Sequence, residues 1–327
     1  MILAGDIGGT KTVLAIIEQS TDGAIRILAE QTYASTEFAS LEDILSLFLS
    51  NAPLIHAACF GIAGPVINQR CQTVNLPWVI DGPQLQSKFG IAQVKLLNDL
   101  EAMALGMLHL PDSDFIDLNP DAIAQVGNIA VIAAGTGLGE AMLFWDGNRY
   151  HAIANEGGHS DFAPVNLVQD QLLSFLRKLY PEHVSYERVL SGNGFSNIYD
   201  FLIDSGFQPC PAVPSREQAT EIGVDRNAVI SRLGLSGEDM VCQNVVQLFA
   251  EIYGAEAGNV ALKTFATGGV YIGGGIAPKI KDVLNNGYFV QAFRQKGRLQ
   301  TMLQNIPVKL ALNPRAPLIG AMHYFMH

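Results

Sequence analysis

Charged side chains are scarce in this sequence, making up 16% of its 327 residues. Lys and Arg number 20 against 31 Asp and Glu, which gives a formal net charge of -11. An acidic surface without a Lys/Arg cluster repels phosphate backbones, so nucleic-acid binding is not expected as the main task. Intrinsic disorder is excluded as well, because 49% of the residues are hydrophobic and disordered chains combine low hydrophobicity with high charge density.

Cysteine is also rare, and the four thiols form no C-x-x-C pair and no Cys/His spacing typical of zinc sites: Cys59, Cys71, Cys210 and Cys242. They are therefore interpreted as reduced thiols of a cytosolic protein. No apolar run reaches the ~18 residues of a membrane span, and the N-terminus lacks the basic start of a signal peptide. We expect a cytoplasmic protein that makes no membrane contact.

Glycine is the residue in excess, with 32 of 327 positions against a typical ~7%. Without a collagen-like period, these glycines must serve turns and close backbone approaches. Apolar strand candidates alternate with amphipathic helix candidates along the chain, which indicates an α/β fold with mostly parallel sheets. The strands are expected at 2–4, 12–17, 25–34, 55–63, 93–97, 129–134, 140–145 and 306–312, and the helices at 41–48, 99–110, 166–180, 193–204, 238–264 and 316–326.

The first glycine turn has the sequence Asp6-Ile-Gly-Gly-Thr-Lys11 and follows a short apolar strand. Adjacent glycines expose backbone N–H groups to which a phosphate can come close, and Thr10 adds a hydroxyl donor. Asp6 at the strand end could hold Mg²⁺, directly or through water. Taken alone, the segment is equally compatible with an ordinary hairpin turn.

Two further glycine motifs follow apolar strands. The second is Ala134-Gly-Thr-Gly-Leu-Gly139, and the third lies in Gly268-Gly-Val-Tyr-Ile-Gly-Gly-Gly-Ile276. Each is a weak signal alone, but three such turns in one chain favour a nucleotide whose polyphosphate and sugar lie against bare backbone.

A carboxylate follows the strand candidate at 93–97, in the pair Asn98-Asp99. Ligands of open α/β sheets bind at the carboxyl ends of strands, and phosphoryl transfer needs a carboxylate to accept the proton of the attacking hydroxyl. Asp99 is the best candidate for such a base. Helix N-capping explains the same residues equally well, because Asn and Asp are both strong N-caps.

A polar cluster is expected from Asn155-Glu-Gly-Gly-His-Ser-Asp161, in which Glu156 and His159 flank two glycines. Carboxylate, amide and imidazole groups suit the vicinal hydroxyls of a sugar. The alternatives are a surface loop for Glu156 and a packed histidine or a metal ligand for His159, although one His without a second ligand at metal spacing supports a metal poorly. Glu187 could join the cluster, begin a helix, or be a solvated charge.

Together these motifs resemble the bacterial ATP-dependent glucokinase family of the actin/hexokinase/Hsp70-like ATPase superfamily. The resemblance rests on DIGGTK, LLND, AAGTGLG, EGGHSDFAP, ERVLSG and GGVYIGGGI in this order, and it covers nearly the whole chain. It implies a two-lobed actin-like ATPase (ribonuclease H-like) fold with a central cleft. The expected lobes are 1–109 plus 313–327 and 110–312.

The resemblance also implies roles for residues of this chain. Asp99 matches the base that deprotonates the sugar 6-hydroxyl. The matching glucose-binding positions are Asn75, Asn98, Asp99, Glu156, His159 and Glu187. The matching MgATP positions are Asp6 (near Mg²⁺), Gly8, Gly9, Thr10, Lys11, Gly135, Thr136, Gly137, Gly273, Gly274 and Gly275.

The expected reaction is that of EC 2.7.1.2, in which MgATP and D-glucose give ADP and glucose 6-phosphate. The enzyme is expected to be a homodimer. A kinase for mannose, glucosamine or fructose is an alternative, as is a sugar-binding regulator that has lost catalysis or an actin-like ATPase scaffold. Lys11 departs from relatives that carry Asn there, which puts only phosphate contacts in doubt. The cysteine-rich zinc motif of the separate ROK sugar kinases is missing.

Overall fold

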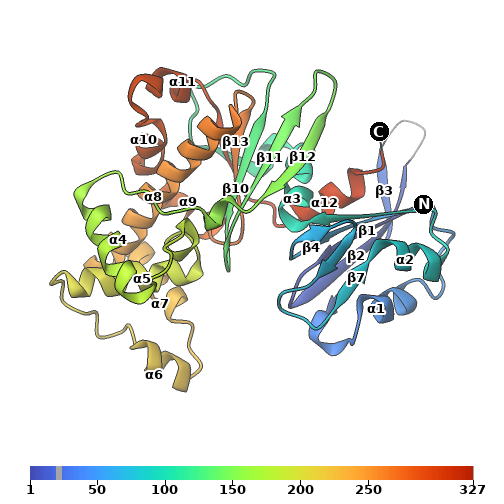
Figure 1. Ribbon diagram of the computed structural model, residues 1–327, viewed down its shortest axis with the longest axis horizontal. Coiled ribbons are helices and arrows are strands. Elements are labelled where there is room, and N and C mark those ends of the chain that lie inside the picture. Colours follow the sequence, from blue (N-terminus) through green and yellow to red (C-terminus); the bar gives the residue numbers. More distant parts are fainter. Residues whose placement is uncertain (20–23, 327) are drawn as a thin grey trace. The chain divides into compact units, whose positions relative to one another are not determined.

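The computed structural model describes residues 1–19 and 24–326, which form two compact units (Figure 1). The first comprises Met1–Asp114, Tyr150–Ala154 and Asn313–His327, and the second comprises Phe115–Arg149 and Asn155–Leu312. The strand β12 (Tyr150–Asn155) therefore crosses the boundary. The lobes expected from the sequence stay a prediction, because compactness alone does not identify parts that move as bodies.

A five-stranded sheet forms the centre of the first unit. Its parallel strands begin with β1 (Ile2–Ile7) and continue through β4 (Ala57–Ile62) to β8 (Gln93–Asn98), and the full order is β3-β2-β1-β4-β8, with β2 at Lys11–Gln19 and β3 at Ile25–Ala34. The register pairs Ile7 with Ile62, and Ile62 with Asn98. The strand ends that carry Asp6 and Asn98 therefore lie at one carboxyl edge, two strands or roughly 10 Å apart.

Apolar side chains cover both faces of this sheet. On one face Leu3 and Phe60 pack with Ile44, on the side of α1 (Leu41–Phe48), α2 (Gly82–Phe89) and a small sheet of β5 (Val66–Ile67), β6 (Arg70–Gln72) and β7 (Val79–Asp81). On the other, Ala4 and Ala15 pack with residues of α3 (Asp99–Met107) and α12 (Ala316–His323). Short 3-10 turns lie at Ser35–Glu37 and Asp112–Asp114.

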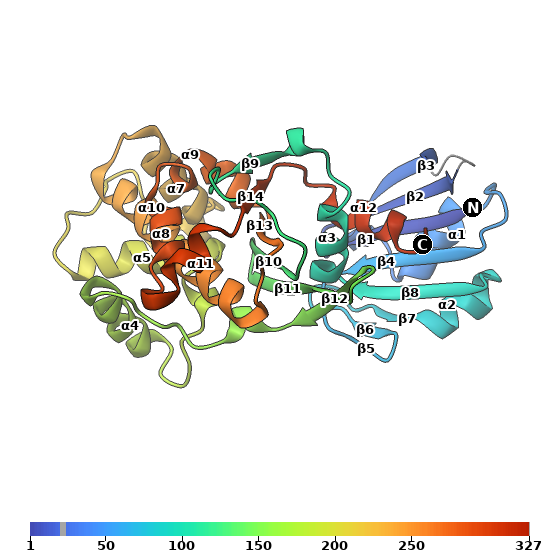
Figure 2. The same ribbon diagram turned by 90° about the horizontal axis from the view of Figure 1, so that it is seen from above.

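Helices α3 and α12 lie side by side (Figure 2), in backbone contact. A Cβ added at Gly106 would lie 1.8 Å from the Ala316 carbonyl oxygen, and one at Gly320 would lie 1.9 Å from that of Ala102. Only glycine allows this approach. The packing fixes the position of α3, the helix that begins at Asp99.

The sheet of the second unit contains the strand order β11-β10-β13-β14-β9. These strands are β11 (Leu138–Trp145), β10 (Ile129–Ala134), β13 (Gly269–Gly273), β14 (Val308–Ala311) and β9 (Phe115–Asp117). β13 is parallel to both β10 and β14, and Ala133 is paired with Gly273. The second and third glycine motifs thus begin at adjacent strand ends.

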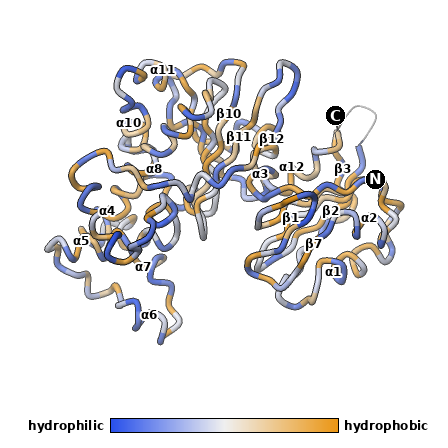
Figure 3. Tube along the Cα trace, in the orientation of Figure 1, coloured by the Kyte–Doolittle hydropathy of each residue, from blue (hydrophilic) through white to orange (hydrophobic). Residues whose placement is uncertain are grey.

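The long helix α8 (Met240–Thr264) lies within the core of this unit, with side chains such as Val245, Phe249 and Tyr253 fully buried. Figure 3 shows apolar residues along the strands of both sheets. The other elements are α4 (Leu167–Leu179), α5 (Gly192–Asp204), α6 (Arg216–Glu221), α7 (Arg226–Ser236), α9 (Lys281–Leu284), α10 (Tyr288–Arg294), α11 (Gln300–Gln304), η3 (Gly157–His159), η4 (Tyr186–Arg188), η5 (Ala277–Ile280) and η6 (Gly297–Leu299).

Three local expectations differ from the structure. Leu138 and Gly139 belong to strand β11 and not to the turn before it, and the last helix ends at His323. The residues 205–217 are rich in Pro, Ser and Gln and are expected to form a loop, but α6 already begins at Arg216, because Ser215 and Gln218 form a capping box. Within residues 1–19 and 24–326, no helix is both long and apolar enough to cross a bilayer.

Candidate active site

The first glycine turn is a tight hairpin between β1 and β2. The Gly8 N–H donates to the Lys11 carbonyl oxygen at 3.0 Å, which leaves Gly9 and Thr10 at the tip. Ser35 supports the turn, because its N–H donates to the Thr10 carbonyl at 3.0 Å and its hydroxyl to the Gly8 carbonyl at 2.8 Å. The geometry is that of a hairpin, and its phosphate-binding role stays a prediction.

Asp6 lies near the end of β1, just before this turn. Burial raises the pKa of its carboxyl to about 6, against the opposing effect of the Lys11 charge. At neutral pH the group is therefore mostly ionised, although its charge is poorly solvated. A carboxylate in this state gains from a nearby cation, and hard oxygen donors are what Mg²⁺ prefers.

Asn75 lies against the tip of the same turn. A Cβ added at Gly9 would be 2.9 Å from the Asn75 Cβ. The structure thus brings a residue expected near the sugar next to a residue expected near phosphate.

The structure separates the two roles that the sequence left open for Asn98 and Asp99. Asn98 caps α3, since its Oδ1 accepts the Leu100 N–H at 2.8 Å and its own N–H donates to Glu101 Oε2 at 2.9 Å. Asp99 is the first helical residue, and its Oδ1 also accepts the Leu100 N–H, at 3.0 Å. Because Asn98 provides the cap, capping does not require the Asp99 carboxylate.

The second glycine turn is held by its own backbone and by the start of α5. The Gly135 N–H donates to the Gly137 carbonyl at 2.8 Å, and the Gly192 N–H donates to the Gly135 carbonyl at 2.9 Å. A third motif packs beside it: Gly274 has φ +83°, and a Cβ there would lie 2.3 Å from the Ala134 carbonyl oxygen. The second and third glycine motifs thus form one backbone-lined surface.

Glu187 connects the predicted sugar cluster with this turn. Its Oε2 accepts the Leu138 N–H at 3.0 Å and lies 3.9 Å from His159 Nε2. A Cβ at Gly137 would lie 2.4 Å from the same oxygen, so a larger residue there would displace the Glu187 carboxylate. Glu187 does lie in the first turn of the short helix η4, as one of the alternatives expected, but its carboxylate is engaged by the Leu138 N–H and is not a freely solvated charge.

The loop that carries Glu156 and His159 packs onto β11 through its two glycines. A Cβ at Gly158 would lie 2.0 Å from the Leu138 carbonyl oxygen, and one at Gly157 would lie 1.9 Å from Glu140 Oε2. Glu156 and His159 themselves are exposed. In the part of the chain that is described, no group of three His, Cys, Asp or Glu donors includes His159, so the metal alternative gains no support.

Glu140, beneath this loop, is one of a pair of buried carboxyl groups. It is 3% exposed, and burial followed by the charge of Glu256 raises its pKa to about 8, while Lys263 lowers it. Glu256 on α8 accepts from Asn259 Nδ2 at 2.8 Å and from Lys263 Nζ at 3.3 Å. At neutral pH Glu140 therefore carries a proton.

A cavity of about 860 Å³ opens beside the second and third glycine motifs. Its lining comprises Gly135, Thr136, Gly192, Phe195, Asp225, Asn227, Ala228, Ser231, Arg232, Leu235, Ser236, Gly275, Ile276, Lys279 and Ile280. Sequence reasoning found Gly135, Thr136 and Gly275 but missed Gly192 and the wall formed by α7. The available signals were Asp225, which caps α7, and the spacing of the buried Ile230 and Leu233.

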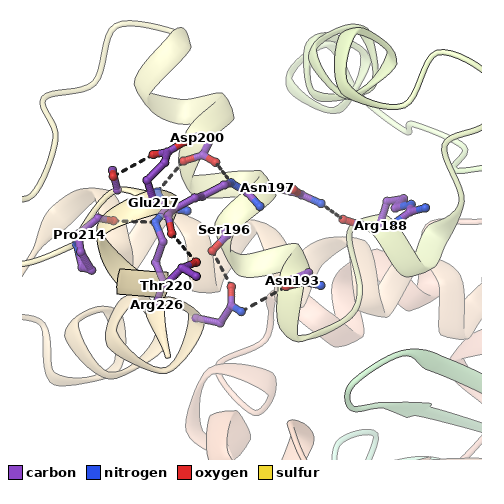
Figure 4. A network of polar contacts seen from close by, with 12 residues as sticks. Arg188, Asn193, Ser196, Asn197, Asp200, Pro214, Glu217, Thr220 and Arg226 are labelled. Atoms are coloured by element: carbon purple, nitrogen blue, oxygen red, sulfur yellow. Dashed lines mark hydrogen bonds and ion pairs between the residues drawn. The ribbon is translucent and has the colours of Figure 1, made fainter. Parts of the chain in front are cut away.

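Polar contacts hold α7, which forms one wall of the cavity, against α5 and α6 (Figure 4). Asp200 on α5 accepts from Arg216 Nε at 2.7 Å and from Arg226 Nη2 at 2.6 Å, and the Ser196 hydroxyl donates to Asn227 Oδ1 at 2.6 Å. Helices α5, α6 and α7 are thereby linked, and Asn227 is held where it lines the cavity.

Comparisons with known proteins agree with this arrangement. The glucokinase family model matches residues 3–327. The glucokinase of Nostoc punctiforme is 41% identical over 332 residues, which cover 98% of this chain and 97% of that protein. The structure is similar to that of glucokinase from an Antarctic psychrotroph, with a TM-score of 0.83, 32% identity and coverage of 98% and 97%.

A more distant structure is a ROK family glucokinase from Streptomyces griseus in complex with glucose and AMPPNP. Its TM-score is 0.61 at 20% identity, with coverage of 98% and 97%, and it shows the shared fold alone. The predicted two-domain α/β fold of the actin-like ATPases is thus confirmed. The chain therefore belongs to the glucokinase family, the kinases that phosphorylate glucose with ATP (EC 2.7.1.2).

Proposed function

We propose that this chain transfers the γ-phosphoryl group of ATP to the 6-hydroxyl of D-glucose, with Asp99 as general base. The observation that carries the proposal is that two glycine motifs of the second unit line one cavity, while Glu187 and the Glu156–His159 loop pack against the strand that follows the second motif. Backbone N–H groups, a hydroxyl and an apolar-walled cavity suit a nucleotide, and the neighbouring polar side chains suit a sugar.

In this proposal the cavity takes the adenosine part of ATP, and the turn at Gly135–Gly137, with the Thr136 hydroxyl, binds its phosphates. The first glycine turn, from Gly8 to Lys11, provides further donors. A protein of similar fold, the ROK glucokinase of Streptomyces griseus, was crystallised with glucose and AMPPNP, which supports a fold able to hold both.

Asp99 accepts the proton of the glucose 6-hydroxyl as that oxygen attacks the γ-phosphorus. The bond between the γ-phosphorus and the oxygen that bridges it to the β-phosphate breaks, and ADP departs. Burial leaves the charge of the Asp6 carboxylate poorly solvated, and this carboxylate would hold Mg²⁺. When bound, Mg²⁺ neutralises charge on the phosphates. The sugar's remaining hydroxyls are expected to contact Asn75, Asn98, Glu156, His159 and Glu187.

A coupled assay of sugar phosphate formation tests the proposal, with ATP or polyphosphate as donor and glucose, mannose, glucosamine or fructose as acceptor. We expect the highest kcat/KM for ATP with glucose, and little ATP hydrolysis without a sugar, because closure around the sugar excludes water. A high basal ATPase rate that glucose does not stimulate would contradict it. Sugar binding without turnover would indicate the regulator instead.

The nucleotide cavity is tested by Ser231→Phe, which places a ring into it. We expect the KM for ATP to rise about tenfold or more, with the KM for glucose changed little, because the ring occupies space that the adenosine requires. Steady-state kinetics with each substrate varied in turn measures both.

The matched control is Ser174→Phe on α4. Both serines lie in helices and donate their hydroxyls to a carbonyl of the same helix, but Ser174 is exposed and does not line the cavity. Equal effects of the two changes on the KM for ATP would count against this cavity as the nucleotide site.

Cytoplasmic location and homodimerisation stay predictions of family membership. Analytical ultracentrifugation measures the oligomeric state.

A further inference from the structure

Two of the four cysteine thiols lie next to a carboxylate in the second unit. Cys210 Sγ, Cys242 Sγ and a carboxylate oxygen of Asp239 all lie within 4.8 Å of one another. Both thiols are buried, and Asp239 is half-buried. Their separation along the chain gave no metal-type spacing, so sequence reasoning did not bring them together.

Backbone contacts hold these donors in place. Asp239 caps α8, with its Oδ1 accepting the Cys242 N–H at 2.9 Å. The Cys210 N–H donates to the Tyr199 hydroxyl at 2.8 Å, and the Val213 N–H closes a turn on the Cys210 carbonyl at 3.0 Å. A site fixed on both sides needs little rearrangement to accept a ligand.

The donor set at the cluster suits a cation. Two sulfur atoms and one carboxylate oxygen lie within 4.8 Å of one another, so all three can approach one ion. Coordination to a divalent cation deprotonates a thiol outright, which supplies the two thiolate ligands.

The carboxylate can be reached from a cavity of about 480 Å³. Its lining runs through two chain segments: Ser205, Gly206, Phe207, Gln208, Pro209, Asp239, Met240 and Val241. The cavity gives a small cation an entry path and room for a water molecule as an additional ligand.

We propose that Cys210, Asp239 and Cys242 bind one soft divalent cation, with Zn²⁺ as the best match to two sulfur donors and one oxygen donor. Each thiol releases its proton to solvent on binding, and water completes the four-coordinate shell from the cavity side. None of the three ligands is among the residues assigned to the kinase reaction. No oxidant is involved, which distinguishes it from a disulfide between the same two sulfurs.

The cation would stabilise the second unit, because it ties the loop around Cys210 to the start of α8. That helix end also contacts α7: a Cβ at Gly234 would lie 2.4 Å from the Cys242 carbonyl oxygen. Since α7 lines the 860 Å³ cavity, binding at Cys242 is expected to stiffen that wall.

The test is a titration of the metal-free, full-length protein with Co²⁺, under a non-thiol reductant and without oxygen. We expect a thiolate-to-cobalt absorption band and visible bands of tetrahedral Co²⁺ that saturate at one cation per chain. Zn²⁺ should abolish these bands and raise Tm by ~3 °C or more. Neither glucose nor ATP enters this assay, so its result does not depend on the proposed function.

Three variants separate the site from adventitious binding. Cys242→Ser should abolish the specific bands, and Asp239→Asn should weaken binding tenfold or more while keeping the cap, because Asn caps helices as well as Asp. Cys71→Ser, a buried thiol of the other unit, should bind Co²⁺ as the unchanged protein does.

Absent cobalt bands in the unchanged, reduced protein would overturn the proposal. Equal bands in the Cys210→Ser/Cys242→Ser double variant would do the same. So would a reduced protein that takes up no cation yet forms a Cys210–Cys242 disulfide on mild oxidation, since the pair would then be a redox site.

Discussion

Asp99→Asn is expected to lower kcat by more than ~100-fold while glucose binding remains measurable. The amide cannot accept the proton of the attacking hydroxyl, whereas its oxygen can still accept the Leu100 N–H that Asp99 Oδ1 accepts. The cap of α3 is retained as well, because Asn98 provides it. Coupled kinetics gives kcat, and isothermal titration calorimetry gives glucose affinity.

Glu101→Gln is the matched control for this change. It makes the same replacement of carboxyl by amide two residues further along α3, and Gln at this position can still accept the Asn98 N–H of the capping box. We expect its kcat to stay within a few-fold of that of the unchanged enzyme. Unchanged turnover in Asp99→Asn would remove Asp99 from the mechanism, and equal losses in both variants would indicate disruption of the helix start.

Glu140→Gln is expected to remove a fall in stability that the unchanged protein shows as pH rises. The pKa of Glu140 is raised from 4.5 to about 8, mainly by burial and then by Glu256. Between these two values the folded state keeps a proton that the unfolded state has released. The free energy of unfolding therefore decreases with rising pH in this window, by up to ~1.4 kcal/mol per pH unit.

The variant cannot ionise at this position, so its stability advantage should grow from about pH 5 to about pH 8 and then level off. Urea unfolding across this range measures it. A Trp78→Phe background makes fluorescence report the second unit through Trp145, because Trp78 belongs to the first. Glu182→Gln removes an exposed carboxyl of the same unit and controls for the change of group.

A constant difference between variant and unchanged protein across the pH range would contradict a proton held by Glu140. The protonation of Glu140 also concerns the loop that carries Glu156 and His159. Because Gly157 packs against Glu140 Oε2, ionisation of Glu140 places charge directly beneath the loop that carries Glu156 and His159. The variant should keep this loop in one state throughout the range.

Much of the fold could be predicted because it depends on neighbours in the chain. Apolar runs followed by glycines locate β1, β10 and β13 with the turns after them, since a buried strand and a tight turn are both specified locally. The core position of α8 follows in the same way, because its apolar residues cover nearly every face. The family was recognisable from motif order alone.

Local sequence signals did not predict a side chain's role where the same residue type suits more than one role. Asn98 and Asp99 are equally good caps by type, and only the side-chain geometry shows that Asn98 closes the capping box. The residues around Glu187 left a helix start and a solvated charge open. Glu187 does lie in the first turn of η4, but the folded chain also places its carboxylate on the Leu138 N–H. Nothing near Glu187 in the sequence specifies that partner.

The sequence pattern alone is enough to specify the α/β class, the three glycine turns, the family and the residue types available for chemistry. Which of these residues come into contact depends on the folded chain: Asn75 with Gly9, Glu187 with Leu138, and Cys210 with Asp239 and Cys242. The difference lies in the distance along the chain over which each feature is specified. Turns and strands follow from steric and apolar preferences within a few residues, but contacts between distant segments depend on sheet register and helix packing, which the whole core sets together.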